Sequence, residues 1–293
     1  MKPNLAESPE EGQTITFPKY ASPKLDGIRA MVQNNKLVSR SLKLIPNEAI
    51  RDMLSPYEGL DGELICGEPS NPDVYNLTYR KVMTKSGDTE GVTFFVFDLL
   101  DLRMSYATRL HDLHAKALPG FIKVLPQSLV TSQITLDAYY AVVLEQGYEG
   151  AILRNPSAFY KQGRSTAASQ DMLKMKPFED SEGLVTGLYE AMETQNPTFK
   201  NELGRTDRST DAEGLVPKGM LGGFVVTVLN GRFKGVTTNI AAGKLSHKER
   251  TDIWNNQTLA MNGVITYRHM PHGAVDAPRH ARFYRFRGDL DVN

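Results

Sequence analysis

The chain has 293 residues, enough for two ordinary domains, and with 40% hydrophobic and 23% charged residues it can form packed cores. No apolar run reaches the length of about 18 residues that a transmembrane helix needs, and the polar, acidic segment 1–12 does not resemble a signal peptide, which argues against a membrane protein. The 34 basic and 34 acidic residues balance, so net charge neither indicates nor excludes nucleic acid, which binds to local basic surfaces.

The first half of the chain alternates short strand patterns with helices. Short apolar or alternating runs predict strands at residues 36–39, 60–65, 92–100 and 150–154. The third run, VTFFVFDLL, is almost continuously apolar, which predicts a strand buried on both faces. Residues 136–146 predict a helix, with Thr135 as its N-cap and Gly147 as its C-terminal stop. The single cysteine, Cys66, cannot form an internal disulfide, which fits a reducing cytoplasm.

The pattern changes near residues 177–182, and the remainder predicts a small β-barrel. Asn230-Gly231 predicts a two-residue hairpin turn. Ser246 and Glu249 form a capping box at the start of a short helix. The expected strands are residues 183–189, 223–229, 232–238, 264–270 and 281–287. Five strands, one helix and one long insertion favour a barrel of the OB type.

The segment Pro23-Lys24-Leu25-Asp26-Gly27-Ile28-Arg29 is the most informative for chemistry. It follows a strand pattern, so the lysine amine lies at a strand end, and Gly27 lets the chain turn sharply and a phosphate approach the backbone. To attack as a nucleophile, Lys24 must be uncharged, which desolvation or a neighbouring cation favours. Taken alone, this short pattern more often marks a surface turn with a salt bridge.

Further segments follow in a fixed order. They are Ser39-Arg40 with Lys43, LDGEL at 60–64, FVFD at 95–98, YEGAILR at 148–154, YKQGRST at 160–166 and LKMK at 173–176. In this order they resemble the ATP-dependent DNA ligases of the covalent nucleotidyltransferase superfamily, which also contains mRNA capping enzymes. The resemblance runs from about residue 17 to residue 289 and is strongest to small viral and phage ligases.

The resemblance implies a nucleotide site built around Lys24, the residue that would carry AMP. Arg29 would contact the ribose and the nick, and Arg40 the nick 5′-phosphate. Phe97 would stack on adenine, although Phe95 competes for that role. The catalytic set would be Lys24, Asp26, Arg29, Lys174 and Lys176. The ATP-binding set would be Ser22, Pro23, Lys24, Arg29, Arg40, Glu63, Phe97, Glu149, Lys174, Lys176, Arg285 and Asp289.

Charge neutralisation explains these residue types, since phosphoryl transfer depends on positioning and electrostatics. Lys174 and Lys176 are two apart, so on a strand both ammonium groups share one face, while Leu173 and Met175 point into the core. Glu63 and Glu149 would hold Mg²⁺ (or Mn²⁺), which prefers oxygen ligands. Taken singly, such glutamates are more often solvated strand ends, and Phe97 would simply be core.

Near the end of the chain, residues 279–289 resemble the last ligase segment, which orients the pyrophosphate leaving group. Positions 283, 285 and 287 would share a strand face, so Arg285 and Arg287 could act together. The family usually has a lysine after Asp289, but this chain has Leu290, which puts the role of Asp289 in doubt. The alternative is a solvated, arginine-rich edge strand.

The polar stretch 193–218 is too long for an ordinary loop, which indicates a functional or mobile excursion. It resembles the insertion that small viral ligases use as a latch around nicked DNA, and a disordered linker is the alternative. Lys200, Arg205 and Arg208 would contact phosphates there. Elsewhere, Arg40, Lys43 and Arg164 would also contact DNA.

The sequence therefore predicts an α+β nucleotidyltransferase domain (ATP-grasp-like, residues 1–178) followed by an OB-fold domain (residues 179–293) with a latch-like insertion near 196–218. The expected function is nick sealing in duplex DNA by a monomeric, cytoplasmic, ATP-dependent ligase of viral or phage type, in replication, repair or recombination. The alternatives are an RNA ligase, a GTP-using capping enzyme, and a nick-binding protein without catalysis.

Overall fold

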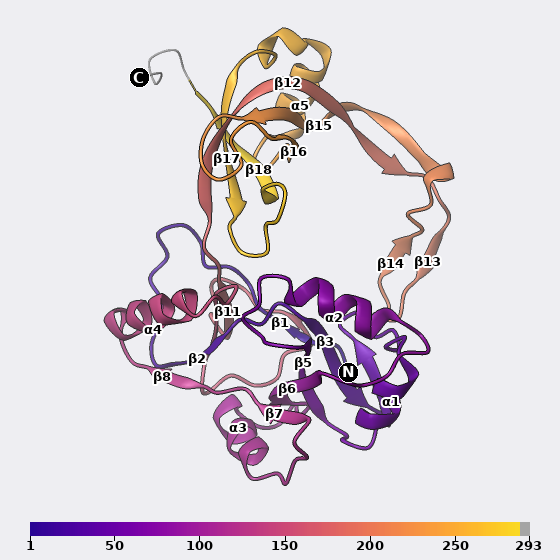
Figure 1. The fold of residues 1–293 in the computed structure, drawn as a ribbon, viewed down its shortest axis with the longest axis vertical. Coiled ribbons are helices and arrows are strands. Elements are labelled where there is room, and N and C mark those ends of the chain that lie inside the picture. Colours follow the sequence, from indigo (N-terminus) through magenta and orange to yellow (C-terminus); the bar gives the residue numbers. More distant parts are fainter. Residues whose placement is uncertain (288–293) are drawn as a thin grey trace. The chain divides into compact units, whose positions relative to one another are not determined.

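A computed structural model describes residues 1–287, so Asp289 and Leu290 lie outside the described residues. The chain divides into two compact units, Met1–Lys176 and Pro177–Asn293. Each unit has its own hydrophobic core, and Figure 1 shows their elements in sequence colours. No helix among residues 1–287 is both long enough and apolar enough to cross a membrane.

The larger sheet of the first unit has five strands in the order β4-β3-β5-β6-β7. Their bounds are Lys36–Ser39, Ile28–Gln33, Leu60–Cys66, Val92–Leu99 and Ile122–Val124. The apolar run at β6 is buried on both faces as predicted, because Phe94 and Val96 pack in one core cluster while Phe95 and Phe97 pack in another. Helices α1, α2 and α3 contact strands of this sheet (Figure 1). They span Glu48–Leu54, Val74–Met83 and Tyr106–His114.

A second sheet in the same unit has the order β11-β9-β2-β8. Its strands are Met172–Met175, Ala151–Arg154, Lys19–Pro23 and Ser128–Val130. The short strands β1 (Asn4–Leu5) and β10 (Gly163–Arg164) pair with each other in parallel. These pairings bring the segments around residues 4, 23, 151, 164 and 174 together, although they are far apart in the sequence.

Helix α4 (Gln133–Glu145) begins earlier than the sequence predicted. Its N-cap is Ser132, and Thr135 lies inside the first turn. The Ser132 hydroxyl accepts the Thr135 amide, and the Thr135 hydroxyl oxygen accepts the Ser132 amide, so the two residues form a reciprocal capping box. The prediction of Thr135 as N-cap was therefore wrong, because both residues can cap and the earlier one is used.

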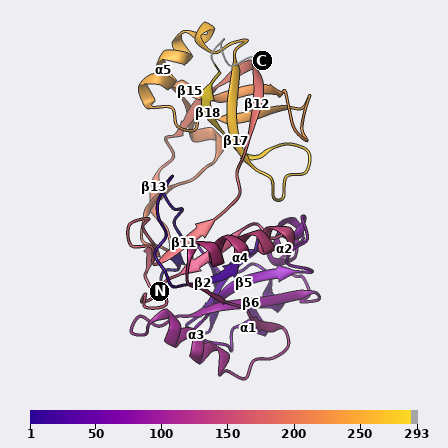
Figure 2. The same cartoon turned by 90° about the vertical axis from the view of Figure 1, so that its left-hand side faces the viewer.

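The second unit is a closed barrel with the strand order β12-β15-β16-β18-β17, which confirms the predicted five-stranded barrel. Its strands span Glu179–Thr194, Leu215–Val228, Thr237–Ala241, Arg279–Phe286 and Val264–Met270. Helix α5 (His247–Asn255) lies beside β15 (Figure 2) and starts with the predicted Ser246–Glu249 capping box. A short 3-10 helix, η2 (Gln257–Leu259), follows it.

The expected two-residue hairpin at Asn230-Gly231 is wrong. After β15 the chain makes a longer turn, and β16 begins only at Thr237. Phe233, placed on a strand by the sequence pattern, is instead buried in the barrel core from within this turn. The Asn230 side chain accepts a hydrogen bond from the Glu182 amide at 2.9 Å, so it binds the backbone of β12 and does not close a tight hairpin.

Two other features of the second unit differ from the simple strand pattern. A register shift in β18 reverses its alternation, so the buried Phe283 and the exposed Phe286 both contact the buried Phe224. Phe283 and Arg285 therefore do not share a face, contrary to the expectation. The polar stretch is an extension of β12 and β15 that carries the small hairpin β13 (Thr198–Lys200) and β14 (Thr206–Arg208) and the 3-10 helix η1 (Ala212–Gly214).

Candidate active site

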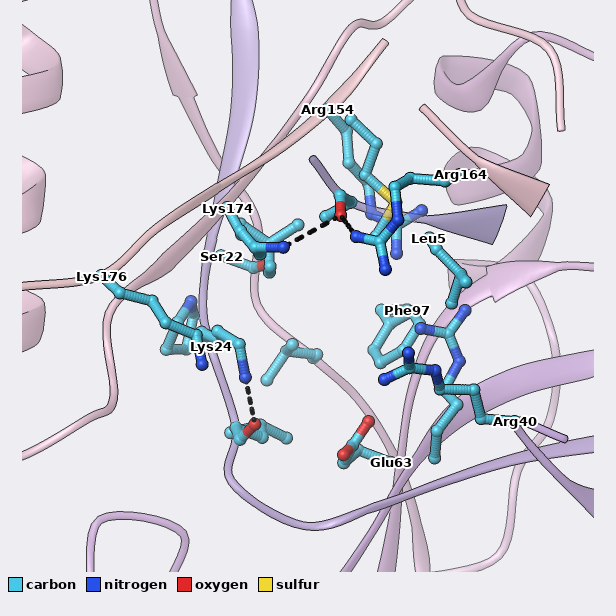
Figure 3. Close-up of a pocket in the computed structure, with 17 residues that line it drawn as sticks. Leu5, Ser22, Lys24, Arg40, Glu63, Phe97, Arg154, Arg164, Lys174 and Lys176 are labelled. Carbon is cyan, nitrogen blue, oxygen red and sulfur yellow. Dashed lines mark hydrogen bonds between the residues drawn. The ribbon is translucent and has the colours of Figure 1, made fainter. Parts of the chain in front are cut away.

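A pocket of about 260 Å³ opens between the two sheets of the first unit. Its lining divides into an apolar part, with Phe97, Leu125 and Ile152, and a strongly charged part. Figure 3 shows Lys24 and Lys176 on one side of the pocket and Phe97 and Arg40 on the other. Such a lining suits a ligand with a flat apolar end and an anionic end.

Lys24 is the first residue after β2. Its backbone amide donates to the Gly150 carbonyl at 2.8 Å, which fixes the strand end beside the loop that carries Glu149. The Lys24 ammonium forms an ion pair with Glu149, and the other oxygen of the same carboxylate pairs with Lys176. Glu149 is only 2% exposed, so a buried carboxylate bridges two lysines at the pocket wall.

Two glycines make this arrangement possible. A side chain at Gly150 would lie 2.1 Å from the Met175 carbonyl oxygen, and its φ of +149° favours glycine. A side chain at Gly27 would lie 2.3 Å from the Leu64 carbonyl oxygen. Gly27 is therefore needed because β5 passes close to it, which differs from the expected approach of a phosphate.

Burial shapes the electrostatics of the lysines. It lowers the pKa of Lys176, with the charge on Lys24 adding to the effect and Glu149 opposing it. Burial also lowers the pKa of Lys174, and the nearby Arg164 lowers it further. Leu173 is buried and Met175 packs against the same core, as the strand alternation predicted, and both lysines line the pocket.

Glu63 lies in the pocket lining on β5. Burial raises the pKa of its carboxyl to about 7, while Arg29 and Lys24 oppose the shift. A carboxyl with such a pKa changes charge near neutral pH, which often marks a functional site. Among residues 1–287, no group of three or more His, Cys, Asp or Glu side chains could hold a metal by itself.

The apolar part of the pocket adjoins a buried network of aspartates and arginines. The Arg29 guanidinium lies 4.5 Å from the centre of the Phe97 ring and that of Arg154 lies 5.0 Å away. Asp61 binds Arg29 through two hydrogen bonds of 2.6 and 2.7 Å. Asp98, its partner on β6, binds Arg154 at 2.7 Å. The two aspartates therefore hold two cations against one aromatic ring.

Asp98 also binds a second buried arginine. Arg109 of α3 donates to both Asp98 oxygens, at 2.6 and 3.2 Å, and is 1% exposed. Sequence reasoning missed Asp61, Asp98, Arg109 and Arg154. A signal was present, because a carboxylate inside an otherwise apolar strand such as FVFDLL must find a partner when it is buried.

The structure brings most of the predicted residues together. Those lining the pocket are Ser22, Pro23, Lys24, Arg29, Arg40, Glu63, Phe97, Arg164, Lys174 and Lys176. Glu149 contacts two of them from behind. Phe95 does not line the pocket, which leaves the ring position to Phe97.

A few predicted residues lie elsewhere. Asp26 is outside the lining, although its charge acts on Lys176. Lys43 is exposed in the turn after β4. In the second unit, Lys200, Arg205 and Arg208 are exposed around the β13–β14 hairpin, and Arg285 is exposed on β18.

Comparison with known proteins agrees with this geometry. Residues 3–176 match the family described as ATP dependent DNA ligase domain. The chain belongs to this family. A DNA ligase of Haemophilus influenzae is 27% identical over 188 residues, which cover 62% of this chain and 65% of that protein. This chain has an adenylation domain followed by an OB-fold barrel.

Solved structures of ligases extend the match to both units. A structure from a study of DNA binding by Lig E DNA ligases with a minimal scaffold is 25% identical, with a TM-score of 0.71, covering 98% of this chain and 100% of that one. The Chlorella virus DNA ligase-adenylate is also 25% identical, with a TM-score of 0.53, covering 98% of this chain and 99% of that one.

Proposed function

We propose that this chain is an ATP-dependent DNA ligase that seals nicks between a 3′-hydroxyl and a 5′-phosphate in duplex DNA, with Lys24 as the residue that carries AMP. The observation that supports it most is the placement of Lys24. This lysine lies at a strand end in the pocket, paired with the buried Glu149 and close to a second pocket lysine, Lys176.

In the first step, the Lys24 nitrogen attacks the α-phosphorus of ATP, a nitrogen–phosphorus bond forms, and pyrophosphate leaves. Lys24 must first lose a proton, and Glu149 is in direct contact to accept it. Lys174, Lys176 and Arg164 line the same pocket and would neutralise the phosphate charge as the bond to pyrophosphate breaks.

The base end of ATP fits the apolar part of the pocket. Phe97 would stack on adenine, with Ile152 and Leu125 lining the same space. Arg29 and Arg154, which the two buried aspartates bind, contact the Phe97 ring, so the ring is held in place before ATP arrives. Rigid placement lowers the entropic cost of reaching the reactive geometry.

The two later steps repeat the displacement at phosphorus. The nick 5′-phosphate oxygen attacks the AMP phosphorus, so the bond to Lys24 breaks and a pyrophosphate bridge forms. The nick 3′-hydroxyl then attacks the 5′-phosphate, loses its proton and expels AMP. Arg40 lines the pocket and would hold the 5′-phosphate during both steps.

Mg²⁺ or Mn²⁺ would assist, and the donor set fits such an ion. Magnesium usually binds one or two carboxylates together with substrate phosphates. Glu63 lines the pocket, and Glu149 is close enough to affect its charge. These two carboxylates would hold the ion, which neutralises phosphate charge when bound.

DNA contacts would come from exposed basic residues in both units. Lys200, Arg205 and Arg208 are exposed around a hairpin that fits the role of a latch on nicked DNA. Contacts of this kind bind phosphates without reading sequence, so affinity should fall with salt. We further propose that the protein is a monomer that acts on intermediates of DNA replication, repair or recombination. The single cysteine, Cys66, is free and partly buried, which is consistent with a reducing cytoplasm.

Incubation with α-labelled ATP tests the proposal directly. The protein should become labelled with ATP and not with GTP, and mass spectrometry should find one AMP on the peptide that contains Lys24. Lys24→Ala should abolish labelling while nicked DNA is still bound. Labelling by GTP would indicate a capping enzyme, sealing of nicked RNA alone would indicate an RNA ligase, and labelling that survives Lys24→Ala would refute the nucleophile.

A further inference from the structure

The segment that precedes β2 in the sequence forms part of the pocket wall. Leu5 and Ala6 line the pocket, although sequence reasoning gave this segment no function. The Pro3 carbonyl accepts the amide of Gly163 at 3.0 Å, and the Leu5 carbonyl accepts that of Ser165 at 2.8 Å. The segment is therefore fixed along β10, at the wall of the pocket.

Glu7 is fixed at the next step of the same segment. Its amide donates to the Met172 carbonyl at 3.1 Å, and its carbonyl accepts the Lys174 amide at 2.8 Å. Both backbone groups of Glu7 are thus used along β11, the strand that carries Lys174 into the pocket. This pairing determines where the Glu7 side chain begins.

The Glu7 carboxylate lies between two cations of the pocket. One oxygen lies 3.8 Å from the Arg164 Nε, and the other lies 4.0 Å from the Lys174 Nζ. The second oxygen also accepts the Ser8 amide at 2.9 Å, which fixes the carboxylate. The Ala6 carbonyl accepts both cations as well, from Arg164 at 2.9 Å and from Lys174 at 3.4 Å (Figure 3).

We propose that Glu7 is a positioning residue for adenylation, holding Lys174 and Arg164 at the pocket wall and yielding these cations to the α-phosphate of ATP. The inference rests on the proposed function. Glu7 touches neither ATP nor Lys24 in this role. It keeps two long, mobile cations in place before the nucleotide binds, and its own negative charge disfavours the incoming phosphate.

This role has a specific kinetic signature. Without the Glu7 charge, the two cations attract phosphate more strongly, so ATP should bind more tightly. The same cations lose their fixed geometry, so AMP transfer should slow. The side chains of Glu7, Arg164 and Lys174 are 33%, 44% and 26% exposed, so solvent screens the pairs. Pairs of this kind contribute a factor of about two to five.

The test is single-turnover adenylation at varied ATP concentration with Glu7→Gln. The KM for ATP should fall about two- to fivefold and the maximal rate should fall by a similar factor. If Glu7 only shaped the pocket wall, its replacement would raise the KM for ATP. If Glu7 were a surface residue without a role, the KM and the maximal rate would both stay unchanged. A KM that rises or stays constant would overturn the proposal.

A pH profile gives a second readout. Burial lowers the pKa of Lys174. The positive charges of Arg164, Lys176 and Lys24 lower this pKa further, whereas the negative charge of Glu7 raises it. Removing the Glu7 charge should therefore lower the pKa of Lys174 again. Because Lys174 must be charged to bind phosphate, the alkaline limb of the adenylation rate should move to lower pH in Glu7→Gln. An unmoved limb would count against the proposal.

Matched variants separate this role from folding and from the proposed function. Glu10→Gln removes the same charge from an exposed position in the same segment and should match wild type. Glu7→Asp keeps the charge but moves the carboxylate away from the two cations, so the maximal rate should fall while the KM for ATP stays unchanged. If Glu7→Gln does not fold, Glu7→Asp tests the positioning role in its place. A wild-type protein that forms no AMP adduct would refute the proposed function, whereas an active wild type with unaltered Glu7→Gln kinetics would refute only the positioning role.

Discussion

Asp98 is fully buried and neutralises two arginines that are themselves almost fully buried, Arg109 and Arg154. Asp98→Asn keeps the size of the side chain, so it creates no cavity, but it leaves two guanidinium groups without their carboxylate. Breaking a buried ion pair by removing one partner costs about 3–5 kcal/mol. We expect a loss of that size in the free energy of unfolding of the first unit.

The two units can be followed separately in one urea titration. The chain has a single tryptophan, Trp254, which lies on α5 in the second unit. Tryptophan fluorescence therefore reports the barrel, while far-UV circular dichroism reports both units. In Asp98→Asn, part of the dichroism change should move to lower urea by about 1 M or more. The fluorescence transition should stay in place.

The control is Asp52→Asn, which removes the same charge from an exposed position on α1. Exposed changes of this kind usually stay within about 0.5 kcal/mol. The reasoning about the buried network would be refuted if Asp98→Asn cost less than about 1 kcal/mol. It would also be refuted if the fluorescence transition moved as far as the dichroism transition.

Two further predictions concern the pocket. Gly150→Ala should reduce both the folded fraction and adenylation severely, because the new methyl would lie 2.1 Å from the Met175 carbonyl oxygen at a φ of +149°. Thermal melting checks this prediction, and a melting temperature equal to that of the wild type would contradict it. Burial raises the pKa of Glu63 to about 7, so its neutral form favours folding at acid pH and this contribution is lost as pH rises toward 7. In Glu63→Gln, the stability difference between pH 4.5 and 7 should shrink, measured by urea titration at each pH; an unchanged difference would contradict the assignment.

The sequence was sufficient to select most of the candidate pocket residues from short segments. Lys24, Glu63, Phe97 and Lys174 lie in short segments that follow one another in a fixed order, and the structure places all four in one pocket. Their grouping depends on sheet pairing between distant strands, and the family resemblance supplied that grouping before the structure did.

The errors came where local signals competed with packing. Asn230-Gly231 has the residues of a tight turn, but burying Phe233 in the barrel core requires a longer one. The predicted alternation of inward and outward side chains in β18 was wrong because the strand register shifts there, and no residue type in the sequence indicates such a shift. Glu7 was missed because its position depends on pairing with residues 172–174, which a local pattern cannot reveal.

The pairing of residues 3–7 with residues 163–174 also affects how the protein is made. During synthesis the early segment leaves the ribosome long before its partner strands exist, so it must wait unpaired. Contacts between segments so distant in sequence form late and slowly. A nascent chain that ends before β11 would lack Lys174 and one edge of the pocket, so nucleotide could not help it to fold.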